Sequence, residues 1–205
     1  LPPSPVTSLA TRMRVLANPR VVAVVLVMLT ATAASIGVYT FIAEVLDDSA
    51  KVHGLTLAAV LLVWGAGGAV GSFGSGWLTD RFGSFGSLSC ALVLLTLTLL
   101  AIPVAASVAA VFVVMALNGA AGWALATPNN HRLTVLEPAL PSVVISFNSA
   151  GIYLGQAVGA VIGGFYLRGH HEPRLLPLLG ALVAALALAM HLVLTRPSGA
   201  AVTAE

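Results

Sequence analysis

Several polar and aromatic side chains interrupt the apolar runs of this sequence, and six of them are candidates for contact with a solute. They are Tyr39, Trp64, Asn118, Asn148, Tyr153 and Gln156. A buried carboxamide needs hydrogen-bond partners, because leaving one unpaired costs roughly 2–7 kcal/mol. Aromatic rings add flat surfaces on which another ring can stack. These residue types can therefore bind a small solute, or they can bond and pack helices together, and the sequence alone leaves both roles open.

The sequence contains no motif that indicates an enzyme or a metal site. No Walker loop, Gly-x-Ser-x-Gly elbow or Rossmann fingerprint occurs. Cys90 is the single cysteine, which excludes a disulfide within the chain, and the His170-His171 pair lacks the i, i+4 spacing of helical metal ligands. Within the apolar runs only Glu44 is a candidate for carrying a proton. We therefore expect no enzyme activity, no catalytic residue, no metal site and no cofactor.

The composition indicates the environment of these side chains. Of the 205 residues, 59% are hydrophobic and 8% are charged, and the mean hydropathy is +1.02. Soluble domains usually carry about 25% charged residues. A chain this apolar has too little polar surface to cover a globule in water, so we expect an all-α membrane protein. Its few basic residues are scattered, which argues against nucleic acid as a partner.

Six apolar runs are long enough to cross a bilayer as helices, which takes about 20 residues each. We place them at about residues 21–46, 55–78, 87–105, 107–126, 142–167 and 175–194. Together they form one predicted transmembrane bundle, residues 21–195, between a lead-in at 1–20 and a tail at 196–205.

A charged elbow joins the second and third of these runs. Asp80 and Arg81 stand between two uncharged stretches, and a charge at the bilayer centre costs at least ~2.5–3.5 kcal/mol. The pair therefore belongs at a membrane surface. Gly76 and Gly83 allow the backbone to turn there, so the elbow predicts a tight helical hairpin.

The distribution of basic residues predicts the orientation of the bundle. Six spans place both termini on one side, together with the elbow. That side would carry Arg12, Arg14, Arg20, Arg81, Arg132 and Arg196, and the other side Lys51, Arg168 and Arg174. Because cytoplasmic loops carry the excess of basic residues, we expect both termini in the cytoplasm.

The polarity of the spans follows a repeating order. The first, second, fourth and fifth spans carry polar and glycine residues, whereas the third and sixth are rich in Leu and Ala. The order polar, polar, apolar thus occurs twice. It is typical of a three-plus-three inverted repeat in which two helices of each triplet face a cavity and one faces lipid.

A stripe of glycines marks the fifth span. Gly151, Gly155, Gly159 and Gly163 recur every four residues and share one helix face. Small residues let a neighbouring backbone approach closely. The stripe indicates tight helix packing, and a groove along which two helices slide is the alternative.

The elbow also resembles a known loop signature. Gly76-x-Leu78-x-Asp80-Arg81-x-Gly83 is similar to the pattern of the major facilitator superfamily, written roughly G-x-L-a-D-R-x-G-R-[RK]. The anchor glycines and the Asp-Arg pair match in register, but Ser84 and Phe85 replace the basic pair. Since the weaker copy of this motif lies in the second half of that family, the resemblance implies its C-terminal six-helix half. It also implies that Asp80 acts as a latch acceptor, with Arg81 as its ion partner.

Two further stretches resemble the drug and sugar efflux branch of the family, namely Val38-Tyr39-Thr40-Phe41-Ile42 and Ser146-Phe147-Asn148. The resemblance implies transport of a small organic solute across the cell membrane by alternating access. One bundle makes one wall, and the chain begins with Leu, so we expect a missing N-terminal half or a second copy as partner, besides lipid and solute. The alternatives are a membrane scaffold or truncated half-transporter without transport activity and, more weakly, an intramembrane enzyme.

Overall fold

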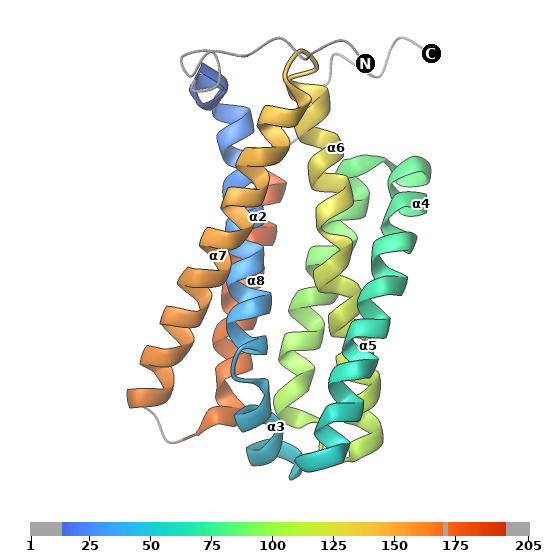
Figure 1. Ribbon diagram of the computed structural model, residues 1–205, viewed down its shortest axis with the longest axis vertical. Coiled ribbons are helices and arrows are strands. Elements are labelled where there is room, and N and C mark those ends of the chain that lie inside the picture. Colours follow the sequence, from blue (N-terminus) through green and yellow to red (C-terminus); the bar gives the residue numbers. More distant parts are fainter. Residues whose placement is uncertain (1–13, 170–171, 196–205) are drawn as a thin grey trace.

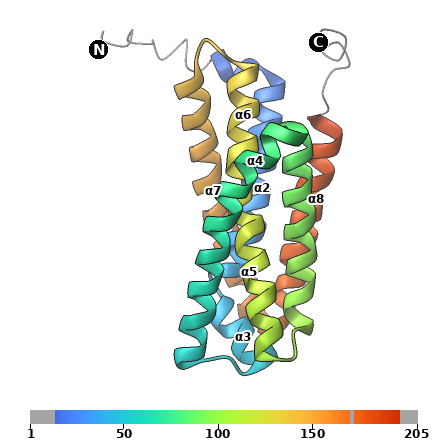
Figure 2. The ribbon, with the colours of Figure 1, turned by 90° about the vertical axis from the view of Figure 1, so that its right-hand side faces the viewer.

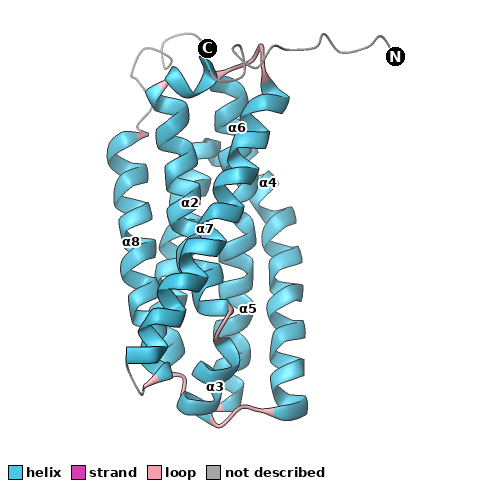
Figure 3. Ribbon diagram, turned by 60° about the vertical axis from the view of Figure 1, so that its left-hand side comes forward, coloured by secondary structure: helices cyan, strands magenta, loops and turns pink. Residues whose placement is uncertain are grey.

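The computed structural model describes residues 14–169 and 172–195, in which every regular element is a helix (Figure 1). The main helices are α2 (Pro19–Tyr39), α3 (Ile42–Ala50), α4 (Gly54–Ala101), α5 (Val108–Ala124), α6 (Ala126–Leu136), α7 (Pro141–Gly169) and α8 (Leu176–Leu194). Short 3-10 turns occur at η1 (Val15–Ala17), η2 (Ile102–Val104) and η3 (Pro173–Leu175). The long helices run roughly parallel to one axis, as Figure 3 shows from another side.

Five helical segments of the described chain are long and apolar enough to cross a membrane. They are Pro19–Tyr39, Gly54–Val104, Val108–Leu136, Pro141–Gly169 and Pro173–Leu194. The structure therefore confirms the all-α membrane class expected from composition. The segment Gly54–Val104 has 51 residues, about twice the length that a bilayer requires.

The length of α4 is explained by a reversal at the elbow. Gly83 has φ 73° and ψ 162°, a conformation that a side chain would exclude. At this point α4 turns back, so that its first arm and its second arm lie antiparallel (Figure 2). The hairpin predicted from the Asp-Arg elbow is thus present, while the total of six membrane crossings stays a prediction.

The first apolar run is divided rather than continuous. Helix α2 ends at Tyr39, and α3 follows after a break at Phe41, whose φ and ψ are −115° and 20°. Helix α3 buries Ile42, Val45 and Leu46 and exposes its acidic face. Because Glu44 and Asp47 cannot remain in hydrocarbon, the chain turns along the end of the bundle instead of extending the first span.

The polar segment after the fourth run is helical. Helix α5 begins where the Ser107 hydroxyl accepts a hydrogen bond from the Ala110 amide at 3.2 Å, and it ends at Ala124. After a turn at Leu125 the chain continues as α6 through the polar stretch between the fourth and fifth predicted spans. Pro128 is tolerated because it lies in the first turn of α6, where backbone N–H groups have no partner within the helix.

Two close helix pairs build the bundle, and α8 packs against both. Helix α2 contacts α7, the first arm of α4 contacts α5, and α8 contacts α2 and α4. The second arm of α4 contributes Leu92, Leu95 and Leu99 to the buried core. The start of α2, the elbow and the end of α8 lie at one end of the bundle (Figure 2).

Candidate solute-binding cavity

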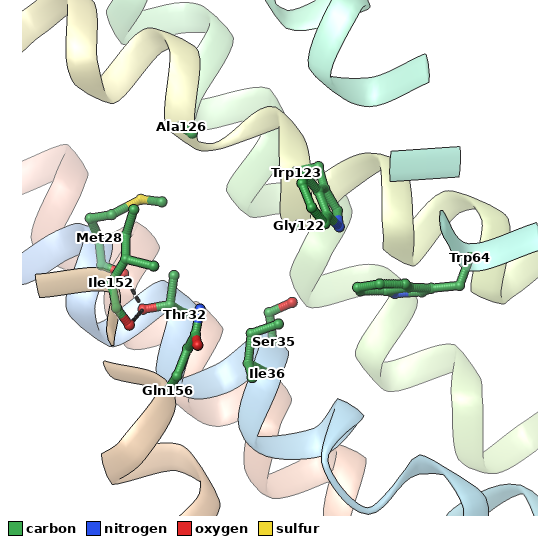
Figure 4. Close-up of a pocket in the computed structure, with 10 residues that line it drawn as sticks. All are labelled: Met28, Thr32, Ser35, Ile36, Trp64, Gly122, Trp123, Ala126, Ile152 and Gln156. Atoms are coloured by element: carbon green, nitrogen blue, oxygen red, sulfur yellow. Dashed lines mark hydrogen bonds between the residues drawn. The ribbon is translucent and has the colours of Figure 1, made fainter. Parts of the chain in front are cut away.

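A cavity of about 200 Å³ lies where α2, the first arm of α4, α5–α6 and α7 converge (Figure 4). Its lining residues are Met28, Thr32, Ser35, Ile36, Trp64, Gly122, Trp123, Ala126, Ile152 and Gln156. They come from the first, second, fourth and fifth apolar runs, whereas α8 and the second arm of α4 contribute none of them. This division is the one that the order of polar and apolar spans predicts.

Aromatic rings form one side of the cavity. Trp64 stacks on Tyr39 with ring centroids 4.0 Å apart, and it meets Trp123 edge to face at 6.2 Å. Asn118, which does not line the cavity, fixes the orientation of the Trp64 ring, because its Oδ1 accepts a hydrogen bond from Trp64 Nε1 at 3.2 Å. Asn118 also donates to the Thr98 hydroxyl at 3.1 Å. The Trp64 ring is thus held on both sides, with 7% of its surface exposed.

Hydrogen-bonding groups form the opposite side. The Thr32 hydroxyl already donates within its own helix, to Met28 O at 2.9 Å or Leu29 O at 3.0 Å. By contrast, the Ser35 hydroxyl and the Gln156 carboxamide have no hydrogen-bond partner among the described residues. The Gln156 side chain reaches from α7 toward α2, across the cavity from the two indole rings (Figure 4). These two groups remain free to bond a solute.

The structure distributes the six candidate side chains over several places. Trp64 and Gln156 line the cavity, whereas Tyr39 and Asn118 support Trp64 from outside it. Tyr153 of α7 has 69% of its surface exposed and is not among the residues that line this cavity. Ser35 and Trp123, which do, are not singled out by the sequence.

Asn148 belongs to a chain of asparagines just beyond the cavity. Its Oδ1 accepts from Asn129 Nδ2 at 2.8 Å, and its own Nδ2 donates to Asn130 Oδ1 at 2.7 Å. These bonds fasten the start of α6 to α7, one helical turn past the cavity residues Ala126 and Ile152. The sequence does not reveal Asn129 and Asn130 as helix-binding residues, because they lie in the polar stretch between the fourth and fifth predicted spans. The available signal is Pro128, a residue that helices accept in their first turn.

Among the four anchor residues of the elbow, Gly83 has a backbone conformation that differs from the rest of α4. Gly83 makes the turn, whereas Gly76 lies in helical backbone, where an added Cβ would meet no neighbouring atom within 4 Å. Asp80 and Arg81 are exposed, and neither makes an ion pair or hydrogen bond with another described residue. The expected pairing of Arg81 with Asp80 is thus absent from the described part of the chain, and both side chains are free to meet a partner outside it.

The two residues after Gly83 attach the elbow to its neighbours. Ser84 Oγ lies 2.6 Å from His131 Nδ1 on α6. The Phe85 ring stacks on His191 of α8 at 4.4 Å and lies 5.4 Å from the Arg132 guanidinium. His191 is fully buried, and its Nε2 lies 3.1 Å from Ser89 Oγ. This contact set, which sequence analysis does not identify, ties α4, α6 and α8 together at one end.

The glycine stripe of α7 forms a seam with α2. All four of Gly151, Gly155, Gly159 and Gly163 are buried. A Cβ at Gly155 would overlap the Leu29 carbonyl, and one at Gly159 would overlap the Ala33 carbonyl. A matching seam joins the first arm of α4 to α5, where Gly67 and Gly71 face the backbone of Ala116 and Ala120. Each seam holds together one of the two helix pairs that flank the cavity.

A second space, of about 240 Å³, lies between the two arms of α4 and α5. Its lining is made of small and aliphatic residues with Ser75, Ser87 and Cys90, and it includes no aromatic ring. It offers less for recognising a solute than the cavity at Trp64, which therefore remains the candidate site.

Comparison with known proteins places this fold in a family. A profile of the Major Facilitator Superfamily matches residues 22–205. The chain belongs to this family, as the elbow motif implies.

Two curated relatives share its sequence over most of its length. The chain is 32% identical over 175 residues to the inner membrane transport protein YdhP of Escherichia coli O157:H7. The aligned stretch covers 85% of this chain and 45% of YdhP. The chain is 32% identical over 131 residues to YbcL of Bacillus subtilis strain 168, an uncharacterized MFS-type transporter, covering 63% of this chain and 33% of that protein. The chain spans about half the length of YdhP, to which it is similar.

Proposed function

We propose that the chain forms one wall of a carrier that moves a small organic solute across the cytoplasmic membrane by alternating access. The observation that carries the proposal is the cavity at Trp64 and Gln156, lined by residues of α2, α4, α5, α6 and α7 in a major facilitator chain. Similarity to an inner membrane transport protein supports the location. The mixture of rings and hydrogen-bonding groups supports a drug- or sugar-like cargo, and the efflux direction follows from the resemblance alone.

We further propose that the bundle crosses the membrane six times with both termini in the cytoplasm. The reversal at Gly83 supports the count, since it divides the 51-residue segment Gly54–Val104 into two arms that can each cross the bilayer. The excess of arginines at the end that holds the elbow supports the orientation. The loss of the basic pair after Gly83 supports assignment to the C-terminal half. The partner is then an N-terminal half or a second copy.

Flux through reconstituted vesicles tests this function. The protein as expressed from its own gene is placed in liposomes, and uptake or release of a panel of sugars and dyes is recorded. We expect flux that falls at least several-fold in Gln156→Leu, because the free carboxamide is lost from the cavity. Leu182→Ala, on the exposed face of α8, is the matched control and should leave flux unchanged.

The rival function, a scaffold without transport, makes the opposite prediction. In that case Gln156→Leu and Asp80→Asn change at most the abundance or thermal stability of the protein, and no solute crosses the vesicle faster than in protein-free liposomes. Flux abolished by Asp80→Asn at unchanged abundance excludes the scaffold.

A further inference from the structure

The lining of the cavity carries no charged side chain, which limits the kind of solute that it can bind. None of its ten lining residues is Asp, Glu, Lys, Arg or His. The described acidic and basic residues lie instead at helix ends, at the elbow within α4, in α3, in α6 beyond the cavity or in connections. The lining residues of this chain therefore provide no counter-charge for an ion in the cavity.

Two kinds of group remain for recognition. Gln156 offers a carbonyl acceptor and an NH₂ donor, and Ser35 offers a hydroxyl, all without partners among the described residues. Across from them stand Trp64 and Trp123, whose rings meet edge to face at 6.2 Å. A solute between the two sides would stack on an indole and present a polar edge to Gln156 and Ser35.

Physical chemistry then decides between charged and neutral solutes. Moving an ion from water into an apolar site without a counter-ion is far more unfavourable than moving a neutral polar group that finds hydrogen bonds. The size also fits one ring system, because an apolar cavity of about 150 Å³ holds benzene. The present cavity, about 200 Å³, has room for a ring with a polar substituent.

We propose that this wall selects uncharged solutes that combine a flat aromatic ring with an edge bearing both a hydrogen-bond donor and an acceptor. This inference rests on the transport function proposed above and assigns the substrate class of the same cavity. Gln156 and Ser35 form hydrogen bonds with the polar edge of the solute, and the rings of Trp64 and Trp123 pack against its aromatic ring. Asn118 acts as a positioning residue, because it fixes Trp64 without reaching the cavity.

Three compounds that share one ring and differ in charge test the proposal. They are nicotinamide, which is neutral, 1-methylnicotinamide, a cation, and nicotinate, an anion. Affinities for the purified full protein are measured by ligand-observed NMR titration. We expect nicotinamide to bind roughly tenfold or more tightly than either ion, because an ion loses its hydration in the cavity without finding a counter-charge among the lining residues.

Substitutions locate the selectivity in the cavity. Gln156→Leu should weaken nicotinamide binding about two- to tenfold through loss of neutral hydrogen bonds. Trp123→Leu should weaken it about two- to tenfold through loss of ring stacking, whereas Trp123→Phe keeps a ring and most of the affinity. Trp77→Leu is the matched control, because Trp77 is exposed like Trp123 but lies outside the cavity, and it should bind as the unsubstituted protein does.

A gain of binding provides the sharpest outcome, since misfolding cannot produce it. Gln156→Glu keeps the side-chain shape and adds a negative charge, so 1-methylnicotinamide should then bind at least as tightly as nicotinamide. The proposal is overturned if either ion binds the unsubstituted protein as tightly as nicotinamide. It is also overturned if none of the three binds while the vesicles still transport another solute, a result that leaves the transport function standing. Absence of flux for every solute contradicts that function itself.

Discussion

At the scale of single residues, polar groups inside the bundle divide into those that hold helices and those that remain free. Asn118 uses both ends of its carboxamide, on Trp64 and Thr98. Asn148 does the same with Asn129 and Asn130. Gln156 and Ser35 have no such partners among the described residues. The chemical type of a residue therefore does not decide its role, which depends on whether a neighbouring helix supplies a partner.

Asn118 provides a prediction at this scale. Asn118→Leu removes two interhelical hydrogen bonds and leaves the Trp64 N–H unpaired. We expect thermal unfolding in detergent to show a loss of about 1–2 kcal/mol, in line with hydrogen bonds between membrane helices. Thr98→Val, which removes only one of the two bonds, is the control and should lose less. Equal stability of Asn118→Leu and the unsubstituted protein would contradict the role assigned to Asn118.

At the scale of elements, backbone geometry at a few glycines determines how the helices meet. Gly83 reverses α4, and the seams of α7 and of the first arm of α4 bring backbones into contact. In the sequence, the glycines beside the Asp-Arg pair predict the reversal, and the four-residue spacing of glycines predicts a small-residue face on α7. The sequence does not reveal which helix lies against each stripe, since that depends on the assembled bundle.

The elbow glycines give a matched pair of substitutions. Gly83→Ala places a side chain at φ 73° and should destabilise the protein by about 1–3 kcal/mol. Gly76→Ala adds a Cβ to helical backbone in open space, so it should be neutral or stabilising by about 0.5–1 kcal/mol. Thermal unfolding of both variants distinguishes these effects. Similar stability for the two variants would mean that Gly83 does not make the turn.

The seam between α2 and α7 gives a second pair. Gly159→Ala should destabilise by about 1–3 kcal/mol, because the added Cβ overlaps the Ala33 backbone, which cannot move aside as a side chain would. Gly164→Ala is the control, since its nearest neighbour is a Phe41 ring atom at 3.7 Å, an ordinary contact distance. The measurement is again the unfolding temperature, together with the yield of folded protein in membranes. Tolerance of Gly159→Ala would exclude a close seam there.

Hydrogen bonds among Asn129, Asn130 and Asn148 hold helix α6 against α7. Breaking them should make buried residues of α6 accessible to a labelling reagent. Asn148→Ala breaks both bonds and should let the start of α6 separate from α7. A cysteine at Leu133, a fully buried position in α6, reports this movement once Cys90 is replaced by serine. We expect its maleimide labelling to accelerate several-fold in Asn148→Ala and to stay slow in Ser149→Ala, whose hydroxyl bonds only its own helix. Unchanged labelling would show that α6 is fixed by other contacts.

At the scale of the whole molecule, hydropathy predicts the membrane class and the helices that surround the cavity, because apolar length and polarity order are properties of the sequence. The turn of α3 and the helical state of α6 are not predicted. The conformations of α3 and α6 depend on how these segments pack at the two ends of the bundle. Each segment mixes apolar and polar residues, so the sequence does not show which of its residues are buried there. The contacts of Phe85, Arg132 and His191 also join residues far apart in the chain, so they become visible only in the assembled fold.

The central claim is that the cavity side of the bundle meets water and solute while the second arm of α4 and α8 meet lipid. Single cysteines in a Cys90→Ser background test it directly in native membranes, by labelling with a membrane-impermeant maleimide. We predict that cysteines at Trp123 and Gln156, which line the cavity, are labelled, whereas cysteines at Leu97 and Leu182, exposed by 57% and 69% on the outer faces, are not. Labelling of Leu97 and Leu182 with none at Trp123 and Gln156 would contradict the account.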